Sequence, residues 1–430
     1  MEHLLEKAGK ICDQAEVYAS ESRGDRVSFE NGRLKDIESS FQYGVSLRII
    51  RDNILGFAYT KNLADEDELI RNALDSLKGG VEGSFRLPLT ERVPSLDTFD
   101  ASLETLTNSA LVGESARICD LLSQKTKGQI NVSANRSVHR KRLMNSSGSD
   151  LGLRSSAYVL NARVLYPYSS ASLNRPHVVK TFKRVPDEYL DHLAGMYNQS
   201  VREATPDRKK LKVLFLPETV YVLMWRLQHA VNGMSIYQRT SPLAGKLGEK
   251  IFDEKLTVVN DPLNDSLPGA RAFDDEGTLC GSFPLVERGV LRNFCYDLYF
   301  ASKLKTVSSG HGFKGSFSSK PLPSLNHLVI MPGSRSFSEI VQSVDFGIIV
   351  AGALGAHSGN IPNGDFSVGV SPALYIEKGE ITGHIKDVMV AGNIYHALSD
   401  IIEVENTLHP SFGGEFPALL LDNVHVTCKT

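Results

Sequence analysis

Apolar and polar positions alternate in different ways along the chain. Near the start, apolar residues recur at helical spacing, at Leu4, Leu5, Ala8 and Ile11. Short strand-like runs follow, at residues 15–20, 26–30, 33–39, 43–50 and 54–60. Asn31-Gly32 and Asp52-Asn53 lie between such runs, and these dipeptides tolerate the positive φ of tight hairpins. The pattern predicts a helix followed by an antiparallel meander.

The next segments alternate between helix and strand. Asn62 or Asp65 could cap a helix with acids in its first turn, running to about Lys78 and stopping at Gly79-Gly80. Residues 81–100 are rich in Pro, Gly and Arg, which is typical of a connector. We then expect a helix from about 100 to 123, strands over 129–165 and a helix over 187–204.

The main change of character follows Thr205-Pro206-Asp207 and the short basic run at 208–212. Beyond it, Gly, Pro and short β-rich runs dominate, with one clear helix from Pro217 to Asn232 that begins with Pro-Glu and ends at Gly233. We predict an α+β protein. Residues 1–205 form an N-terminal α/β domain with subregions 1–80 and 100–205. Residues 206–430 form a β-rich domain opened by helix 217–232.

Composition narrows the class of protein. The 430 residues carry a net charge of −3, so nothing indicates the basic face that nucleic acid requires. The five cysteines are scattered, without a CxxC pair, which is typical of reduced thiols. The first twenty residues contain four acids, and the most apolar stretch, 346–356, is too short to span a bilayer. We expect a cytoplasmic protein that binds neither nucleic acid nor membrane.

The common catalytic motifs are absent from the sequence. The 12 histidines never come closer than twelve residues, and no His-Glu dipeptide occurs, so no helix carries a pair of zinc ligands. GxSxG and the P-loop pattern do not occur. One GxGxxG match, 310–315, lacks the buried strand before it and the helix after it, so we interpret it as a loop.

Asp274-Asp275-Glu276-Gly277 is the densest acidic cluster of the second half. Paired carboxylates can act as acid and base when their pKa values are pushed apart. Composition alone favours the simpler interpretation, an exposed turn closed by Gly277. His311 and His357 each lie in a Gly/Ser loop, where a solvated histidine is the simpler expectation.

Several blocks, in order, resemble the TldD/PmbA metalloprotease family, once labelled modulators of DNA gyrase. The first spans residues 28–60, with Glu30-Asn31-Gly32 and Gly56-Phe57-Ala58 as landmarks. Later blocks are 241–249, 273–277, 287–291, 363–367, 376–381 and 391–393. Residues 80–205 match poorly, and the last thirty are only loosely similar.

The resemblance implies two branches with different chemistry. TldD-like members carry HExxxH on the helix that opens the C-terminal domain, together with a later cysteine ligand. PmbA-like members, also called TldE, lack this set and pair with a TldD-like subunit. The corresponding helix here has Met224, Trp225, Arg226 and Leu227 around the motif position, and only His229 could be a remnant ligand. The resemblance therefore implies the PmbA/TldE-like branch, with zinc in the partner and no metal or catalytic residue in this chain.

For architecture, the resemblance implies an N-terminal α/β domain, a C-terminal domain dominated by a large antiparallel sheet, and a dimer around a cavity. An extended peptide could add to an exposed strand. The residues of the family-like blocks that could line a substrate groove are Asp274, Asp275, Glu276, Asp365 and Asn393. Gly277, Gly364 and Gly392 suit backbone turns.

Three hypotheses follow. In the first, the chain is a non-catalytic, peptide-binding subunit of a zinc metalloprotease that trims or degrades unfolded peptides, paired with a TldD-like catalytic subunit. In the second, it is a stand-alone homodimer that binds peptides without protease activity. In the third, it is an independent hydrolase using Asp274, Asp275 or Glu276.

Overall fold

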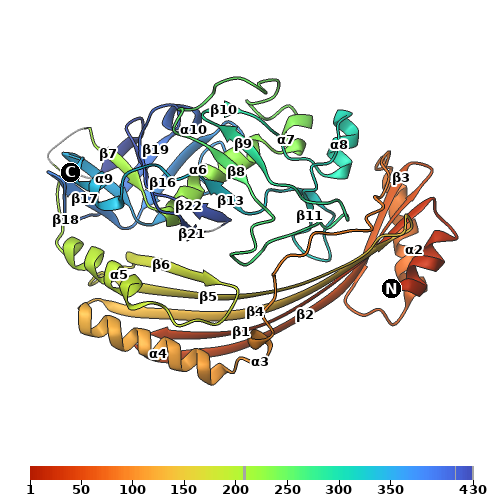
Figure 1. Ribbon diagram of the computed structural model, residues 1–430, viewed down its shortest axis with the longest axis horizontal. Helices are drawn as coiled ribbons and strands as arrows, with labels where there is room; N and C mark the ends of the chain where they lie inside the picture. The colour runs from red at the N-terminus through yellow and green to blue at the C-terminus, as the bar shows by residue number, and fades with distance from the viewer. Residues whose placement is uncertain (207–209, 412, 429–430) are drawn as a thin grey trace.

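The computed structural model of the protein describes residues 1–206, 210–411 and 413–428. Helices and strands are mixed, and the strands fall into several mainly antiparallel sheets, which confirms the predicted α+β class. A long, curved sheet from the first half of the chain runs beneath the second half (Figure 1). The predicted boundary and basic run fall partly on 207–209, which lie outside the described residues.

The first sheet has six antiparallel strands in the order β3-β2-β1-β4-β5-β6. Its strands are β1 (Gln14–Glu30), β2 (Arg33–Arg51), β3 (Ile54–Thr60), β4 (Gln129–Asn145), β5 (Asp150–Leu165) and β6 (Ser172–Val179). Asn31, Gly32, Asp52 and Asn53 have φ between 49° and 70°, as the two predicted hairpin turns require. The expected break between residues 20 and 26 is wrong. Polar residues 21–25 continue β1 because β2 and β4 pair with them on both sides.

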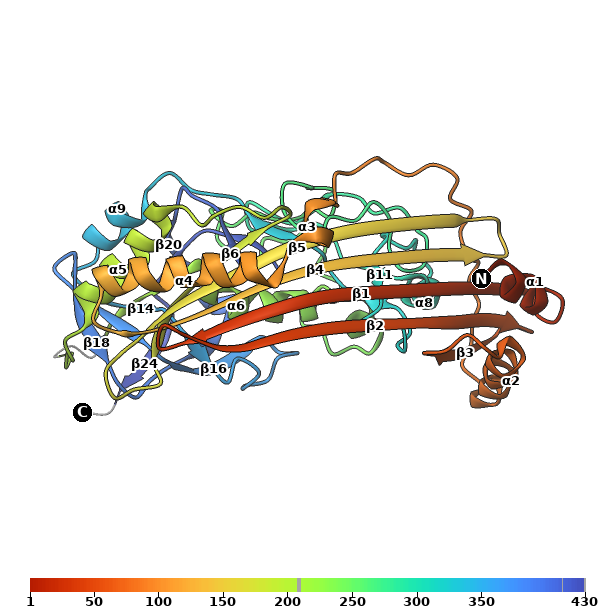
Figure 2. The same cartoon turned by 90° about the horizontal axis from the view of Figure 1, so that it is seen from below.

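Helices cover this sheet at several places. They are α1 (Glu2–Gly9), α2 (Glu66–Ser76), α3 (Ser102–Thr105), α4 (Asn108–Lys125) and α5 (Asp187–Ser200), with a 3₁₀ turn at Leu77–Gly79. Asp65 caps α2 by accepting a hydrogen bond from the Glu68 N–H at 2.8 Å, so the second of the two predicted caps is correct. The helix expected over 100–123 is split before Thr107, whose side chain caps α4. Figure 2 shows α4 and α5 side by side along the sheet, with α1 and α2 at its far end.

The second half divides its strands among four sheets rather than one. Two have six strands, β18-β17-β14-β7-β23-β20 and β10-β9-β8-β13-β22-β21, one has the order β15-β16-β19-β24, and β11-β12 is a short ribbon. The β7–β14 and β13–β22 pairs are parallel. The strands are β7 (Lys212–Phe215), β8 (Val258–Asn260), β9 (Phe283–Glu287), β10 (Val290–Leu291), β11 (Gly312–Phe313), β12 (Leu322–Pro323), β13 (Leu328–Ile330), β14 (Phe346–Val350), β15 (Ala353–Leu354), β16 (Asp365–Val370), β17 (Ala373–Glu377), β18 (Glu380–Ile385), β19 (Val388–Asn393), β20 (Ile401–Val404), β21 (His409–Ser411), β22 (Gly414–Phe416), β23 (Leu419–Leu421) and β24 (His425–Cys428).

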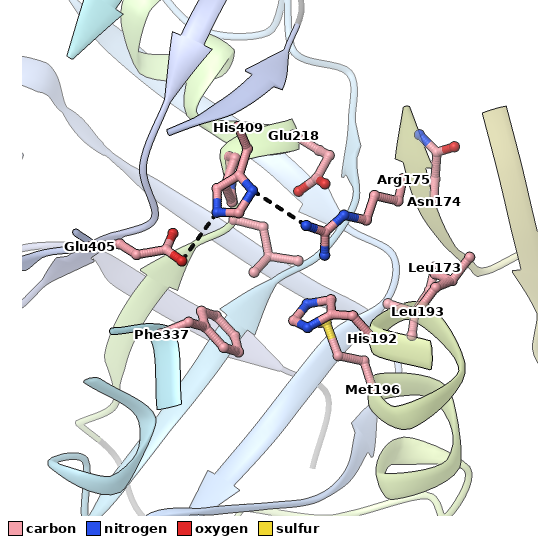
Figure 3. Close-up of a pocket in the computed structure, with 12 residues that line it drawn as sticks. Leu173, Asn174, Arg175, His192, Leu193, Met196, Glu218, Phe337, Glu405 and His409 are labelled. Carbon is pink, nitrogen blue, oxygen red and sulfur yellow. Dashed lines mark hydrogen bonds and ion pairs between the residues drawn. The ribbon is translucent and has the colours of Figure 1, made fainter. Parts of the chain in front are cut away.

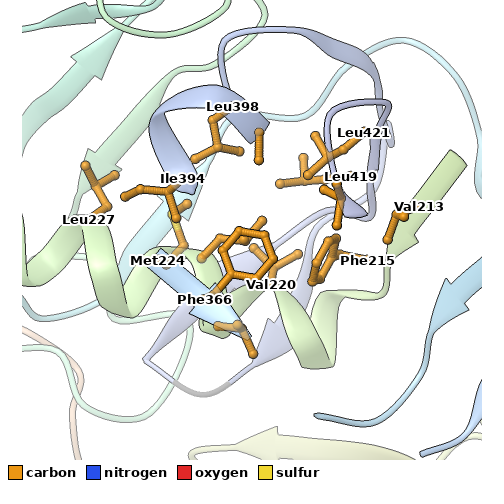
Figure 4. Packing of buried hydrophobic residues seen from close by; sticks show 14 of the residues in the cluster. Val213, Phe215, Val220, Met224, Leu227, Phe366, Ile394, Leu398, Leu419 and Leu421 are labelled. Atoms are coloured by element: carbon orange, nitrogen blue, oxygen red, sulfur yellow. The ribbon is translucent and has the colours of Figure 1, made fainter. Parts of the chain in front are cut away.

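Helix α6 (Pro217–Ala230) lies in the centre of this half, and the predicted helix 217–232 is correct to within two residues. Val220, Met224 and Leu227 pack against β7, β16, β23 and the short helix α10 (Ile394–Ala397), as Figure 4 shows. The remaining helices are short: α7 (Gly233–Tyr237), α8 (Leu298–Leu304), α9 (Phe337–Gln342) and α10 (Ile394–Ala397). No helix among the described residues is long and apolar enough to cross a membrane.

Strand pairing separates the two halves, but their hydrophobic packing does not. The first sheet uses strands up to residue 179, and every other sheet uses strands from residue 212 onward. One buried cluster nevertheless combines Leu173 and Tyr197 of the first half with Leu214, Ile349 and Leu420 of the second. Whether 1–205 and 206–430 fold as separate domains therefore stays a prediction.

Candidate functional site

The acidic turn at residues 273–279 is buried, so the expectation of an exposed turn is wrong. Phe273 and Leu279 form a β-bridge across it, and the exposed fractions of Asp274, Asp275 and Glu276 are 0%, 1% and 0%. The turn packs against the first sheet. There its carboxylates contact cationic side chains from distant parts of the chain, Arg48 of β2 and Lys141 of β4. Those partners explain the burial, because a buried carboxylate requires paired charge or hydrogen bonds.

Arg48 of β2 joins the two halves through two ion pairs. Its guanidinium lies 2.6 Å from Glu16 of β1 and 2.6 Å from Glu276 of the turn. Burial alone would lower the pKa of Arg48, but Glu16 and Glu276 outweigh it and hold that pKa above its usual value. Burial raises the pKa of Glu276, although Arg48 opposes the rise. Because all three side chains are at most 3% exposed, the group is a buried ionic connection between the halves.

Asp275 has its own set of cations. Arg271 donates to its carboxylate at 2.6 Å, Lys141 of β4 at 3.3 Å and the Lys314 backbone N–H at 3.0 Å. Burial would raise the pKa of Asp275, but Arg271 and Lys141 lower it well below its usual range. Burial lowers the pKa of Lys141 to about 8, and that of Lys314 likewise to about 8. Asp275 is thus a stably ionised group inside a cationic pocket.

Asp274 accepts three backbone hydrogen bonds, from the N–H groups of Glu276, Thr278 and Gly312 at 2.8–3.0 Å. Burial, and then Glu276, raises its pKa. The opposite pKa shifts of Asp274 and Asp275 meet one requirement for acid–base chemistry. Their enclosure does not, because a substrate cannot reach side chains that are at most 1% exposed. This geometry argues against the independent hydrolase, and a groove role for the three acids stays a prediction.

The other two predicted groove residues lie elsewhere and contact each other. Asn393 ends β19 and donates to Asp365 of β16 at 2.8 Å, while its side-chain oxygen caps α10 through the Tyr395 N–H. Asn393 also lines a cavity of about 670 Å³ with Gly392 and His396. Asn393 thus borders an open cavity, and its role in a substrate groove stays a prediction.

On α6, the position of the family's metal motif is occupied by core residues. Met224 is 0% exposed and lies within the main hydrophobic cluster. Trp225 and His229 are partly buried on the neighbouring face, and burial lowers the pKa of His229. A catalytic zinc requires three protein ligands. Among residues 1–206, 210–411 and 413–428, no three His, Cys, Asp or Glu side chains are placed to bind a metal ion.

Arg226 is a buried residue whose role the sequence interpretation missed. Its guanidinium is 0% exposed and donates to four backbone carbonyls, of Val222, Asp365, Ala356 and Ser358, at 2.7–3.0 Å. Burial lowers its pKa. Arg226 therefore ties α6 to the loop before β16. The one available signal was a charged residue inside the apolar run VLMWRLQ, at 222–228.

Sequence comparisons match most of this chain to models of one protein family. The model described as PmbA/TldA metallopeptidase C-terminal domain matches residues 208–428, and that for domain 1 matches residues 15–78. A Methanothermobacter thermautotrophicus protein named Metalloprotease is 25% identical, covering 90% of this chain and 87% of its own. Metalloprotease PmbA of Escherichia coli O157:H7 is 23% identical, covering 98% and 94%.

Solved structures share the fold. TldE from Thermococcus kodakarensis superposes with a TM-score of 0.91 at 24% identity, covering 99% of both chains. A Thermotoga maritima protein described as a candidate modulator of a DNA gyrase gives a TM-score of 0.88 at 22% identity, again covering 99% of both chains. At this level of identity, the likeness shows the arrangement of the elements alone.

Proposed function

Because the chain belongs to the PmbA/TldA metallopeptidase family, we propose that it is a non-catalytic, peptide-binding subunit of a zinc metalloprotease that trims or degrades unfolded peptides. A TldD-like partner would supply the zinc, both histidines, the water-activating glutamate and the cysteine. This chain would shape the substrate chamber and hold the peptide. It would itself carry no catalytic residue.

The observation that supports this role best is the state of α6. The helix keeps its place in the fold and its packing, but Met224 fills the core where a histidine ligand would stand. Trp225 occupies the position of the water-activating glutamate, and a single histidine, His229, is left. A helix whose packing is intact and whose ligand set is missing suits a subunit retained for its shape.

An open strand edge supports the binding part of the proposal. β3 pairs with β2 only at Val45–Arg51, so within the described chain residues 33–44 of β2 have no strand on one side. Leu34, Ile37 and Phe41 on this segment are 47%, 44% and 59% exposed. An extended peptide or a partner's strand can add to such an edge through backbone hydrogen bonds. That mode of binding depends weakly on sequence, as handling of unfolded chains requires.

The thiols support a reducing compartment for this function. All five cysteines are unpaired, and burial raises the pKa of Cys119 to about 11. Protonated, buried thiols are unreactive. We therefore place the proposed complex in the cytoplasm.

The test is reconstitution. The purified chain is mixed with a TldD-like subunit that carries HExxxH, and complex formation is measured by light scattering beside cleavage of an unfolded peptide with and without a zinc chelator. We expect one complex whose cleavage requires zinc and both chains. A partner whose motif histidines are replaced by alanine is the control, and it should bind without cleaving. No association at micromolar concentration would refute the proposal.

A homodimer that binds peptides without protease activity is the alternative. The same open edge of β2 supports it, because two identical edges can pair with each other. A stable homodimer that binds extended peptide, and that ignores every HExxxH-bearing partner, would favour it over the first proposal.

A further inference from the structure

A small charged cavity lies between the two halves of the chain (Figure 3). It is enclosed by β6 and α5 of the first half and by the start of α6, α9 and residues 405–409 of the second. Its volume is about 40 Å³, whereas one water molecule needs roughly 10–15 Å³ on the same measure. The cavity therefore has room for a few heavy atoms and is distinct from the acidic turn and from the motif face of α6.

On one side of the cavity, Arg175, His409 and Glu405 form a hydrogen-bonded chain. Arg175 Nη2 lies 3.3 Å from His409 Nδ1, and His409 Nε2 lies 3.1 Å from Glu405. An arginine can only donate, so Nδ1 accepts and the Nε2 proton is donated to Glu405. Glu405 is 4% exposed and accepts a further hydrogen bond from the Ala418 N–H at 2.9 Å. His409 and Glu405 are thus satisfied, while Arg175 retains N–H groups that point into the cavity.

Glu218, the second residue of α6, faces this chain from the other side. Figure 3 shows its carboxylate directed toward Arg175 and His409. The backbone N–H of Glu218 itself contacts this carboxylate, but in the part of the chain that the structure describes no ion pair within 4.0 Å and no hydrogen bond from another side chain reaches it. Burial raises its pKa. Glu218 and Arg175 are both partly buried, and a carboxylate and a guanidinium that lose water without forming an ion pair are costly unless something bridges them.

The chemistry of the bridging group follows from its two neighbours. It must donate to Glu218, accept from Arg175 and occupy the space of a few heavy atoms. An α-ammonium group beside a carbonyl oxygen meets all three conditions. Asn174 and Glu218 also line an adjoining cavity of about 460 Å³, bounded by β5, β6, Pro410, Ser411, Gly413 and Gly414. The remainder of a longer ligand could lie there.

We propose that this cavity binds the N-terminal residue of a peptide, with its ammonium group on Glu218 and its first carbonyl oxygen on Arg175. The proposal rests on the peptide-binding role and specifies which end of the peptide this subunit holds. Glu218 precedes Met224 by six residues and His229 by eleven, or about 9 and 16 Å along a helix. The site is therefore not a remnant of the family's metal motif.

The test compares one unfolded peptide with a free N-terminus against the same peptide acetylated there, by calorimetry with the full chain. Loss of one charge-assisted contact should weaken binding about 10- to 100-fold. In E218Q the two peptides should bind alike, because the amide carries no charge to distinguish them. The matched control is E203Q, which alters an exposed carboxylate paired with Lys386 at 2.7 Å and should keep the wild-type preference.

Each other outcome overturns a definite part of the idea. Equal binding of both peptides by the wild type would refute the amine site and leave peptide binding intact. Binding of neither peptide would refute the proposed function itself. Competition by free alanine as strong as that of the peptide would identify a free amino acid as the ligand and overturn the peptide assignment. The wild-type comparison decides the matter even if E218Q does not fold.

Discussion

Replacing Arg48 with methionine should be among the most destabilising single changes to this protein. The methionine keeps much of the apolar length that packs near Phe85, whose ring centre lies 5.5 Å from the guanidinium. It removes both ion pairs of 2.6 Å, so Glu16 and Glu276 become buried carboxylates without their main partner. Removal of one member of a buried ion pair costs about 3–5 kcal/mol.

Two further contacts determine where in this range the loss of stability should fall. Lys314 Nζ lies 3.8 Å from Glu16 and gives it partial compensation. Glu276 retains a hydrogen bond from the Leu298 N–H at 2.7 Å. We expect a loss near 4 kcal/mol, which is a large part of the 5–15 kcal/mol that stabilises a typical domain.

The pH dependence of R48M gives an independent check. Burial already raises the pKa of Glu276, and without Arg48 its main opposing cation is gone, so the folded-state pKa of Glu276 lies above its unfolded value. The penalty at Glu276 is therefore absent below about pH 4 and grows as the pH rises through the folded pKa. Urea unfolding followed by tryptophan fluorescence should show a large deficit at pH 8 and a smaller one at pH 5.

The control is R51M on the same strand, where the side chain is 53% exposed and the loss should stay within about 0.5 kcal/mol. If R48M and R51M unfold at the same urea concentration at pH 8, the buried ionic connection does not stabilise the fold as argued. A triple variant that also carries E16Q and E276Q should recover part of this stability, because both buried carboxylates are then neutral, although Lys314 loses Glu16 as its partner.

Three other changes test separate parts of the structure. M224H/W225E gives α6 the sequence HExxxH but places a polar ring in the core. We therefore expect thermal unfolding to show a loss of stability of about 2–4 kcal/mol, and we expect no zinc-dependent cleavage. One bound zinc per chain with cleavage would contradict this. Asp297 is 1% exposed, and burial, then a neighbouring carboxylate, raises its pKa to about 7. Its contribution to stability is complete below about pH 4 and is lost as the pH rises through 7, so D297N should gain on the order of 1–3 kcal/mol over the wild type at pH 8 and not at pH 4. Gly310 has φ +72°, and a Cβ added there would overlap a backbone carbonyl, so G310A should cost about 2–4 kcal/mol of stability. G315A should be neutral, because a Cβ added at Gly315 meets nothing closer than 3.8 Å. If residues 310–315 were a nucleotide loop, both variants would instead lose nucleotide binding.

Local features of the fold followed from the sequence. The hairpin turns at Asn31-Gly32 and Asp52-Asn53 and the cap at Asp65 depend on residues close together in the chain, and each has its expected geometry. Whether a polar segment interrupts a strand was harder to predict. Polar residues 21–25 remain in β1 because two neighbouring strands hold them, and no pattern within the segment encodes those neighbours.

The charged sites could not be predicted, because their partners are remote in sequence. Glu276 meets Arg48 across 228 positions, so an acidic run that suits a solvent-exposed turn is in fact buried. The cavity at Glu218 collects Arg175, His192 and His409 from separate elements. The family resemblance pointed to the blocks that hold Arg48 and Glu276, but the residues of the Glu218 cavity lie outside those blocks, and only the fold brings them together.

Under the proposed function, the structural roles of α6 would account for a helix kept without metal ligands. α6 contributes three things that depend on its position and not on zinc: Met224 in the core, Arg226 on the loop before β16, and Glu218 at the junction of the halves. Loss of the ligands would leave all three intact, whereas loss of the helix would remove them together. If the chain is the proposed non-catalytic subunit, its cavities are free to adapt to peptide, since no residue of α6 would also have to hold a metal. Changes at Glu218 should then alter which peptides the proposed complex accepts, while the rate of the chemical step, which the partner would supply, stays the same.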